Sequence, residues 1–158
     1  QALMQLEHRE EIVLLSVGGF SIPNKVKQKY QIVELGWVFE EQQMIEFMMA
    51  CDIFLMPSLA ESFGLMSIES LAAGSAFVCF KGTVMEEITQ AQECGISVKY
   101  CSSKELAKAI EYLIKNPNER KNRGILGHEL VKKKYSFNQY IDKHKELYEK
   151  ILEQNLKD

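Results

Sequence analysis

The sequence predicts an α/β protein with a Rossmann-like, doubly wound parallel sheet and C-terminal helices. Up to Tyr100, short and continuous apolar runs alternate with segments of helical periodicity, a pattern typical of parallel strands that are buried on both faces. Beyond Tyr100 only helical patterns occur. The chain has 158 residues, 46% of them hydrophobic and 26% charged, so residues 1–158 are expected to form a single globular domain.

Five apolar runs are expected to form the strands. They are rich in β-branched and aromatic side chains, and turn residues bound several of them, such as Gly18 and Gly19 after the first run and Pro57 after the third. The expected strands are residues 12–17, 32–37, 53–56, 76–80 and 96–99.

Helical segments fill the spaces between these strands and continue after them. Apolar residues at helical spacing predict helices over residues 40–51, 64–73 and 84–92. After Tyr100, capping boxes mark three helix starts. They pair Ser102 with Glu105, Asn116 with Glu119 (with Pro117 in the first helical position), and Ser136 with Gln139.

The last helix carries an apolar stripe at helical spacing, which is expected to pack against the sheet domain. Its residues are Tyr140, Ile141, His144, Leu147, Tyr148, Ile151 and Leu152.

Charge and hydropathy exclude several classes of partner. The formal net charge of -3 argues against a protein that neutralises nucleic-acid phosphates, so no nucleic-acid partner is expected. No run of 18 apolar residues occurs, and the polar N-terminus lacks the layout of a signal peptide, so no membrane span is expected. These features favour a cytoplasmic location.

The cysteines and histidines predict no metal site. The four cysteines form no CxxC pair, and Cys51 and Cys79 lie in apolar segments, which favours reduced, buried thiols. His8, His128 and His144 lie in polar helical stretches without partners at ligand spacing, so they are interpreted as surface residues.

One loop has the features of an anion site. In doubly wound sheets, ligands bind beyond the carboxyl ends of the strands, and residues 57–64 join the strand that ends at Met56 to a helix. The first amides of a helix have no intrahelical acceptor, and its dipole is positive at that end. Gly64 has no side chain to keep a ligand away, so the loop is a candidate phosphate site.

Glu61 and Glu69 flank this loop and the start of its helix. A carboxylate does not attract a phosphate, but it can accept hydrogen bonds from two sugar hydroxyls at once. The pattern therefore fits a sugar diphosphate with a ribose at its other end. On spacing alone an alternative stays open, in which Ser62 caps the helix and both glutamates are solvated.

The same stretch resembles the E-x7-E signature of retaining GT-B glycosyltransferases of the GT4 type, the glycosyl transferases group 1. It contains both glutamates, the Phe-Gly-Leu core at residues 63–65 and the Ala-Ala-Gly of residues 72–74. Residues 34–38 and 50–58 resemble two of the family's strands, and residues 116–117 and 135–137 resemble its terminal helices. The resemblance covers nearly all of this chain, but only the C-terminal, donor-binding domain of the family's two.

The resemblance implies a role for each matching residue. Glu61 would be the catalytic carboxylate that holds the donor sugar, and Glu69 would bind the ribose. Ser62, Phe63, Gly64, Leu65 and Met66 would contact the donor sugar and the diphosphate. Gly18, Gly19, Val38 and Phe39 would lie near the base.

The resemblance also implies the ligands. The donor would be a UDP-, GDP- or ADP-sugar, and no cofactor or metal would be needed, because helix amides and basic side chains neutralise the diphosphate. The acceptor, a glycan or a lipid-linked glycan of surface polysaccharide, would be bound by the N-terminal domain. The full protein would be cytoplasmic, either free or attached peripherally to the inner face of the membrane.

Two departures from the family pattern limit these expectations. The family's domain opens with a strand carrying Gly-Arg and then Lys-Gly before a helix, whereas Gln1 to Leu6 looks like the end of that helix. The strand, which would lie in the middle of the sheet, and both cations are therefore expected upstream. Lys81 is interpreted as a loop lysine, and residues 82–87 only approximate the family's Gly-Gly-x-x-Glu segment. A non-catalytic nucleotide-sugar-binding or interaction module with the same fold stays open as the alternative function.

Overall fold

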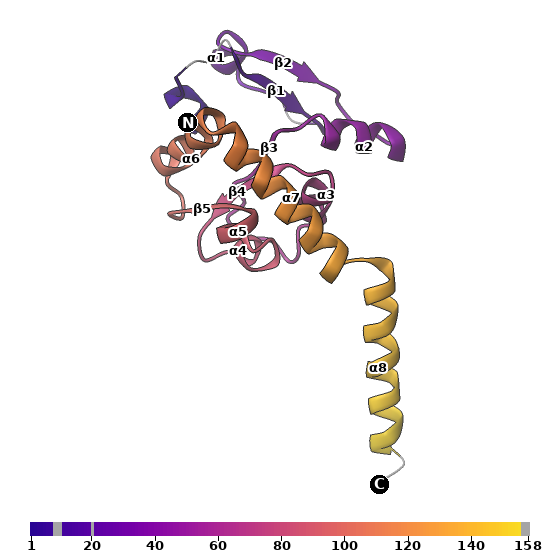
Figure 1. Ribbon diagram of the computed structural model, residues 1–158. Helices are drawn as coiled ribbons and strands as arrows, with labels where there is room; N and C mark the ends of the chain where they lie inside the picture. The colour runs from indigo at the N-terminus through magenta and orange to yellow at the C-terminus, as the bar shows by residue number, and fades with distance from the viewer. Residues whose placement is uncertain (8–10, 20, 156–158) are drawn as a thin grey trace.

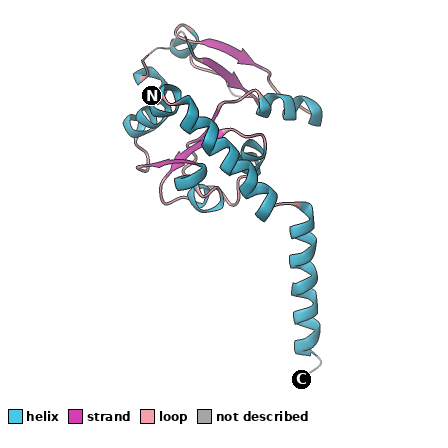
Figure 2. Cartoon of the chain, viewed as in Figure 1, coloured by secondary structure: helices cyan, strands magenta, loops and turns pink. Residues whose placement is uncertain are grey.

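The computed structural model describes residues 1–7, 11–19 and 21–155 of the chain (Figure 1). Strands and helices alternate from β1 to β5, and the helices α6, α7 and α8 then complete the described chain (Figure 2). All strand pairs are parallel, which confirms the predicted α/β class. His8 lies outside the described residues.

The strands form two parallel sheets. β1 (Val13–Ser16) pairs with β2 (Gln31–Glu34), and β3 (Ile53–Met56), β4 (Ala76–Phe80) and β5 (Gly95–Val98) form the other sheet in that order. Two of the five strands have the predicted bounds. The other three differ by one to three residues at their ends, where hydrogen bonding and not apolarity decides the boundary.

Within the described residues, β1 and β3 each have one strand neighbour. All four residues of β3 are half-buried, whereas all five residues of β4, which has strands on both sides, are buried. The sheet is thus divided between β1 and β3, where the sequence leads us to expect a further strand.

The helices mostly follow the predicted segments. Residues 84–92 were predicted as one helix, but they contain all of α4 and the start of α5, because Gln90 between them has a left-handed φ of 46°. The short α1 was not predicted. The bounds are η1 (Ala2–Gln5), α1 (Asn24–Lys27), α2 (Glu41–Met49), α3 (Leu65–Ala72), α4 (Val84–Ile88), α5 (Ala91–Cys94), α6 (Ser103–Lys115), α7 (Pro117–Lys134) and α8 (Phe137–Asn155).

The core lies on both faces of the β3–β4–β5 sheet. Ala76, Val78 and Phe80 of β4 pack with α6 and η1 on one face. Phe77 and Cys79 point to the other face, where α3, α4, α5 and α7 cover them. This alternation explains why the sequence of β4 is apolar at every position. The Cys79 thiol is unreactive, because burial raises its pKa to about 12.

Glycines let α7 cross the end of α3 closely. Gly124 and Gly127 of α7 are buried. A Cβ atom on Gly124 would lie 2.0 Å from the carbonyl oxygen of Gly74, directly after α3, and one on Gly127 would lie 2.6 Å from Leu71 Cδ2. The position of α3 therefore depends on backbone-to-backbone packing with α7.

Two of the three predicted caps are confirmed. Ser102 Oγ accepts a hydrogen bond from the Glu105 amide at 3.2 Å, and Ser136 Oγ accepts one from the Gln139 amide at 3.4 Å. Asn116 is the N-cap residue of α7, as predicted, but it makes no side-chain capping bond, because its side-chain amide donates to the Tyr112 carbonyl of the preceding helix instead. Pro117 does begin α7, where its missing N–H costs no helical bond.

The prediction that α8 packs against the sheet domain is wrong. The helix projects from the rest of the chain (Figure 1), and most of its apolar stripe is exposed, with 62% of the Tyr148 and Leu152 surfaces accessible. Phe137, Tyr140 and His144 instead contact one another along the helix. No helix within the described ranges is long and apolar enough to cross a membrane.

Candidate functional site

The first group of predicted site residues surrounds the N-terminal end of α3. The chain leaves β3 at Met56, and α3 begins at Leu65 after Gly64, which has a left-handed φ of 74°. A Cβ atom at Gly64 would lie 2.6 Å from Met85 Cε and 2.7 Å from Met85 Sδ. Conformation and packing thus both require glycine where the loop becomes a helix.

The inner face of α3 is held by the core. Ser67, Ser70 and Leu71 are buried; Ser67 Oγ donates to Met85 Sδ at 3.1 Å, and Ser70 Oγ donates to the Ser67 carbonyl at 2.9 Å. These bonds satisfy the buried hydroxyls. The Ser67 bond to Met85 of α4 and the burial of Leu71 determine which face of α3 points into the core.

The outer face of α3 combines the predicted diphosphate and ribose residues. Glu69 follows Leu65 by four positions and Met66 by three, so the three side chains share one helix face, and all are exposed. The Ser67 amide donates to the Gly64 carbonyl at 2.9 Å. The amides of Leu65 and Met66 lie ahead of any intrahelical acceptor, so they can bind an anion beside Glu69.

Glu61 lies in the exposed loop ahead of α3. Its Oε1 is 3.5 Å from Ser58 Oγ, which holds the carboxylate weakly. Phe63 packs edge-on against Tyr135, with ring centroids 6.1 Å apart, and Tyr135 Oη donates to the Ile88 carbonyl at 2.8 Å. The alternative role for Ser62 is wrong, because Gly64 occupies the N-cap position and no side chain caps α3.

The second group of site residues lies in the loops after β1 and β2. The Gly18 amide donates to the Gly36 carbonyl at 2.6 Å, which joins the two loops. A Cβ atom on Gly19 would lie 2.9 Å from Trp37 Nε1, so Gly19 permits the indole to approach. Val38 is half-buried, and Phe39 beyond it is 90% exposed. The site therefore has two parts, one on each sheet.

Trp37 was not predicted as a site residue, although it lies between Gly19 and Val38. Its side chain is 72% exposed. The sequence prediction placed Trp37 at the end of the strand over residues 32–37, whereas β2 ends at Glu34 and leaves Trp37 in the loop that follows.

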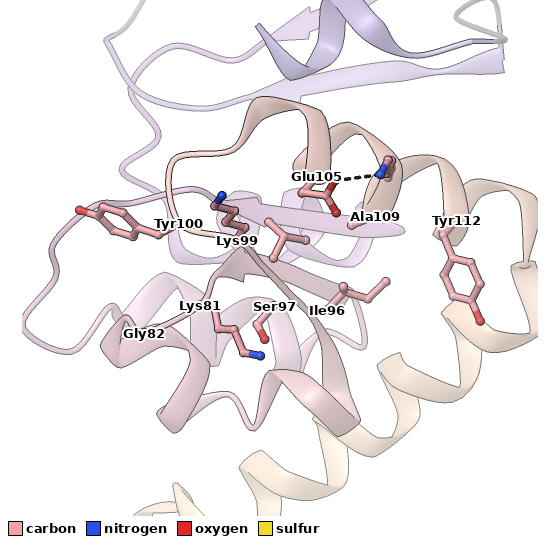
Figure 3. A pocket seen from close by; sticks show the side chains of 11 residues that line it. Lys81, Gly82, Ile96, Ser97, Lys99, Tyr100, Glu105, Ala109 and Tyr112 are labelled. Atoms are coloured by element: carbon pink, nitrogen blue, oxygen red, sulfur yellow. Dashed lines mark hydrogen bonds and ion pairs between the residues drawn. The ribbon is translucent and has the colours of Figure 1, made fainter.

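A shallow hollow of about 830 Å³ follows the carboxyl ends of β4 and β5 (Figure 3). Lys81 lines this hollow. Its side chain and that of Lys99 lie on different sides of β5 in Figure 3. Glu105, which also lines the hollow, forms an ion pair with Lys108 at 2.8 Å. Tyr100 Oη donates to the Leu59 carbonyl at 3.3 Å, which links this hollow to the Glu61 loop. No motif or periodicity in the sequence indicates that contact.

Glu86 holds the turn that follows β4. Its carboxylate accepts hydrogen bonds from the Gly82 amide at 2.8 Å, from Ser97 Oγ at 2.6 Å and from Gln92 Nε2 at 3.2 Å. The Gly82 amide bond, followed by the Ser97 bond, lowers the pKa of Glu86. Residues 82–87 thus owe their shape to internal bonds. In the described part of the chain, no group of three or more His, Cys, Asp or Glu residues could hold a metal ion.

Replacing Gly64 by alanine is expected to lower the free energy of unfolding by about 2–4 kcal/mol, since a left-handed non-glycine residue costs roughly 1–2 kcal/mol and overpacking at Met85 adds to it. Gly82→Ala is the matched control, because Gly82 has the same φ of 74° but open space around its Cβ position. Urea unfolding of both variants measures the difference. Equal losses would show that the Met85 contact does not require glycine.

Comparisons with known proteins indicate the family and the fold. The model of the family described as "Glycosyl transferases group 1" matches residues 1–128. The α-maltose-1-phosphate synthase of Mycolicibacterium smegmatis is 24% identical over 124 residues, which cover 73% of this chain and 32% of that protein. The chain therefore spans about a third of the curated relative.

Two solved structures illustrate the likeness. The C-terminal domain of a glycosyl transferase group 1 family protein from Francisella tularensis is 30% identical, with a TM-score of 0.64 over 72% of this chain and 60% of that one. HepE from Anabaena, solved in complex with UDP, is 18% identical, with a TM-score of 0.78 over 94% of this chain and 43% of that one. The second likeness shows the fold alone.

Proposed function

The chain belongs to the glycosyl transferases group 1 family, and from this premise we propose that it is the donor-binding domain of a retaining GT-B glycosyltransferase. The observation that carries the proposal is the N-terminal end of α3. There, the first amides of α3 follow Gly64 without an intrahelical acceptor, and they lie in the sequence between two exposed carboxylates, Glu61 and Glu69. Amides suit a diphosphate, and carboxylates suit the hydroxyls on either side of it.

The proposed donor lies along the outer face of α3. The amides of Leu65 and Met66 bind the diphosphate, and Glu69, one turn further along the same face, accepts the ribose hydroxyls. Glu61 approaches the other end of the diphosphate from the preceding loop and accepts hydroxyls of the sugar. The Ser67 bond to Met85 and the buried Leu71 keep this face turned outward.

The base is proposed to lie at the loops after β1 and β2. Gly18 has open space beside its backbone where a ligand can lie, whereas Gly19 faces the Trp37 indole. Val38 and Phe39 supply an apolar surface. Phe39 is exposed, so it can meet a base without rearrangement of the core. Trp37, in contact with Gly19, adds an aromatic face for stacking.

A UDP-sugar is the first donor to test, because HepE shares this fold and was solved with UDP. In a retaining transfer the bond between the anomeric carbon and the diphosphate breaks, and the acceptor oxygen forms its bond on the same face of the sugar. The contribution of this domain is orientation and electrostatic stabilisation of the leaving diphosphate by the α3 amides. A glycan or lipid-linked acceptor is proposed to bind to a second domain.

Replacing Glu69 by alanine is expected to weaken nucleoside diphosphate binding about ten- to a hundredfold, because hydrogen bonds to a charged group contribute roughly 1.5–3 kcal/mol. Titration calorimetry with UDP measures this change. Glu129→Ala, on the exposed side of α7, is the matched control and should bind like the parent chain.

The Glu61→Ala variant distinguishes the proposed role of Glu61 from that of Glu69. It should weaken binding of UDP-glucose but leave UDP binding unchanged, because only the sugar contacts Glu61. Equal UDP affinity of the folded Glu69→Ala variant and the parent chain would rule out the ribose role.

A further inference from the structure

β5 forms an outer edge of the β3–β4–β5 sheet, because within the described residues it pairs with β4 alone. The hollow of about 830 Å³ follows this edge, and residues 96–99 of β5 and its end line it together with α6 (Figure 3). An outer strand presents a row of backbone N–H and C=O groups with which another polypeptide can pair. The register of β5 decides which of these groups are open to a partner.

The outward-pointing residues of β5 include Ser97 and Lys99. The Val98 carbonyl accepts a hydrogen bond from the Lys81 amide at 2.7 Å, so the backbone groups of Val98 point to β4. Backbone groups of successive residues in a strand point to alternate sides. Those of Ile96 therefore also point to β4, whereas those of Ser97 and Lys99 point away from it.

The chain itself satisfies the outward groups at both ends of β5. The Gly95 amide bonds back into α5, and the Gly95 carbonyl accepts a hydrogen bond from Arg123. The Lys99 carbonyl accepts the Ser102 amide at 3.1 Å. Among the described residues, the N–H and C=O of Ser97 and the N–H of Lys99 have no backbone partner. The middle of the edge thus offers both donors and an acceptor.

The two faces of this edge differ in chemistry. Toward α6, Ile96 and Ala109 belong to the apolar core cluster, and Tyr112 beside them is 46% exposed. Lys81 and Ser97 lie on the opposite side of β5 in Figure 3. Successive side chains of a strand point to opposite faces, so an added strand would direct every second side chain to the apolar wall and the others toward Lys81.

The charge of the hollow favours an acidic partner. Its described lining contains Lys81, Lys99 and Lys108 against one carboxylate, a formal charge of +2, whereas the whole chain has a formal net charge of -3. That carboxylate, Glu105, is already held by Lys108 at 2.8 Å. Glu86, on the side of Lys81, accepts three hydrogen bonds from its own surroundings. A second copy of this chain would bring like charges together, which disfavours pairing of two β5 edges.

We propose that the hollow binds an extended segment of a partner protein, in which apolar and acidic residues alternate, as an added strand beside β5. The segment's backbone bonds to Ser97 and to the Lys99 N–H. Its apolar side chains face Ile96 and Tyr112, and its acidic side chains lie within reach of Lys81 and Lys99. A polypeptide suits this edge better than a phosphate chain, because the Ser97 carbonyl needs a donor and phosphate oxygens only accept.

The test titrates residues 1–158 with a blocked hexapeptide of alternating valine and glutamate and follows the backbone amides by NMR. The Ser97 and Lys99 amides should shift most, and their hydrogen exchange should slow at least ~tenfold at saturation. Two control peptides carry N-methyl groups on alternate amides, one for each edge of the peptide strand. One of them should bind at least ~tenfold more weakly, and which one it is gives the direction of the added strand.

The Lys99→Glu variant tests the charge of the hollow. It should weaken binding of the glutamate peptide roughly three- to tenfold and strengthen binding of the same peptide with lysine in place of glutamate. Lys121→Glu, at an exposed position of α7, is the matched control, because it changes the net charge equally and should bind like the parent chain. Sedimentation with and without peptide checks that the protein stays monomeric.

Several outcomes would overturn the proposal. Equal binding of the unmodified peptide and both N-methyl peptides would show that the lysines attract an anion without strand pairing. Equal shifts with inorganic phosphate would assign the hollow to a small anion. No shift of Ser97 and Lys99 at millimolar peptide would show that the lysines only protect the edge. Slow exchange that accompanies dimer formation would assign the edge to a second copy. No nucleotide enters these experiments, so their result is independent of the role of Glu69.

Discussion

Residues 1–158 are expected to transfer no sugar when they are incubated with a nucleotide sugar and a simple glycoside acceptor. Transfer needs an acceptor oxygen held against the anomeric carbon, and orientation alone can supply ~7–11 kcal/mol of barrier reduction. The chain spans 32% of its curated relative, and we propose that the acceptor is held by a second domain. Without that domain, the expected loss of rate is on the order of 10⁵-fold or more.

Sugar transfer by residues 1–158 is measured with a panel of UDP-, GDP- and ADP-sugars, and released nucleotide is the readout. Binding is expected to persist, with a dissociation constant nearer millimolar than micromolar, because the Arg and Lys that the family resemblance implies for the diphosphate are not among these residues. The control adds a domain able to bind the acceptor, which should restore turnover. Efficient turnover by residues 1–158 alone would show that they supply the whole active site.

Gly124→Ala is expected to lower the free energy of unfolding by at least ~2 kcal/mol, although alanine is normally the better helix former by about 1 kcal/mol. The reason is the contact with Gly74, whose carbonyl oxygen would lie 2.0 Å from the new Cβ atom. A backbone atom cannot rotate away as a side chain can, so α7 must move off α3. That shift would also displace the N-terminal end of α3 and weaken nucleotide binding.

Asn122→Ala, two positions earlier on the exposed side of α7, is the matched control and should be neutral or stabilising. Denaturant unfolding of both variants measures the free energies, and hydrogen exchange in α3 reports its position. A stabilised Gly124→Ala variant would contradict the close crossing of the two helices.

The strands were predictable because parallel strands with cover on both faces are apolar at every position, as in residues 76–80. Breaks within helical segments were harder to predict. Gln90 interrupts residues 84–92 because its backbone is left-handed, and glutamine has no strong conformational preference from which this could be predicted. The stripe on α8 shows a further limit, since periodicity identifies an apolar face but not what covers it.

The candidate site was predictable in residue type but not in arrangement. Gly64 and Glu69 lie as their spacing implies, at the start of α3 and on its outer face. Ser62 was open to two interpretations; the N-cap at Gly64 excludes the capping role, and the contact of Ser62 with the donor stays a prediction. Contacts between distant segments, such as Tyr100 with Leu59 or Gly19 with Trp37, leave no periodic signal in the sequence.

The projecting α8 determines how the protein would respond to a protease. A helix of 19 residues without a packed face is only marginally stable in water, so its peptide bonds open often enough to be cleaved. Tyr135 is held by Ile88 and Phe63, so trimming should stop near that residue. The trimmed core would retain both parts of the candidate site, and it would be the better starting material for crystallisation with nucleotide.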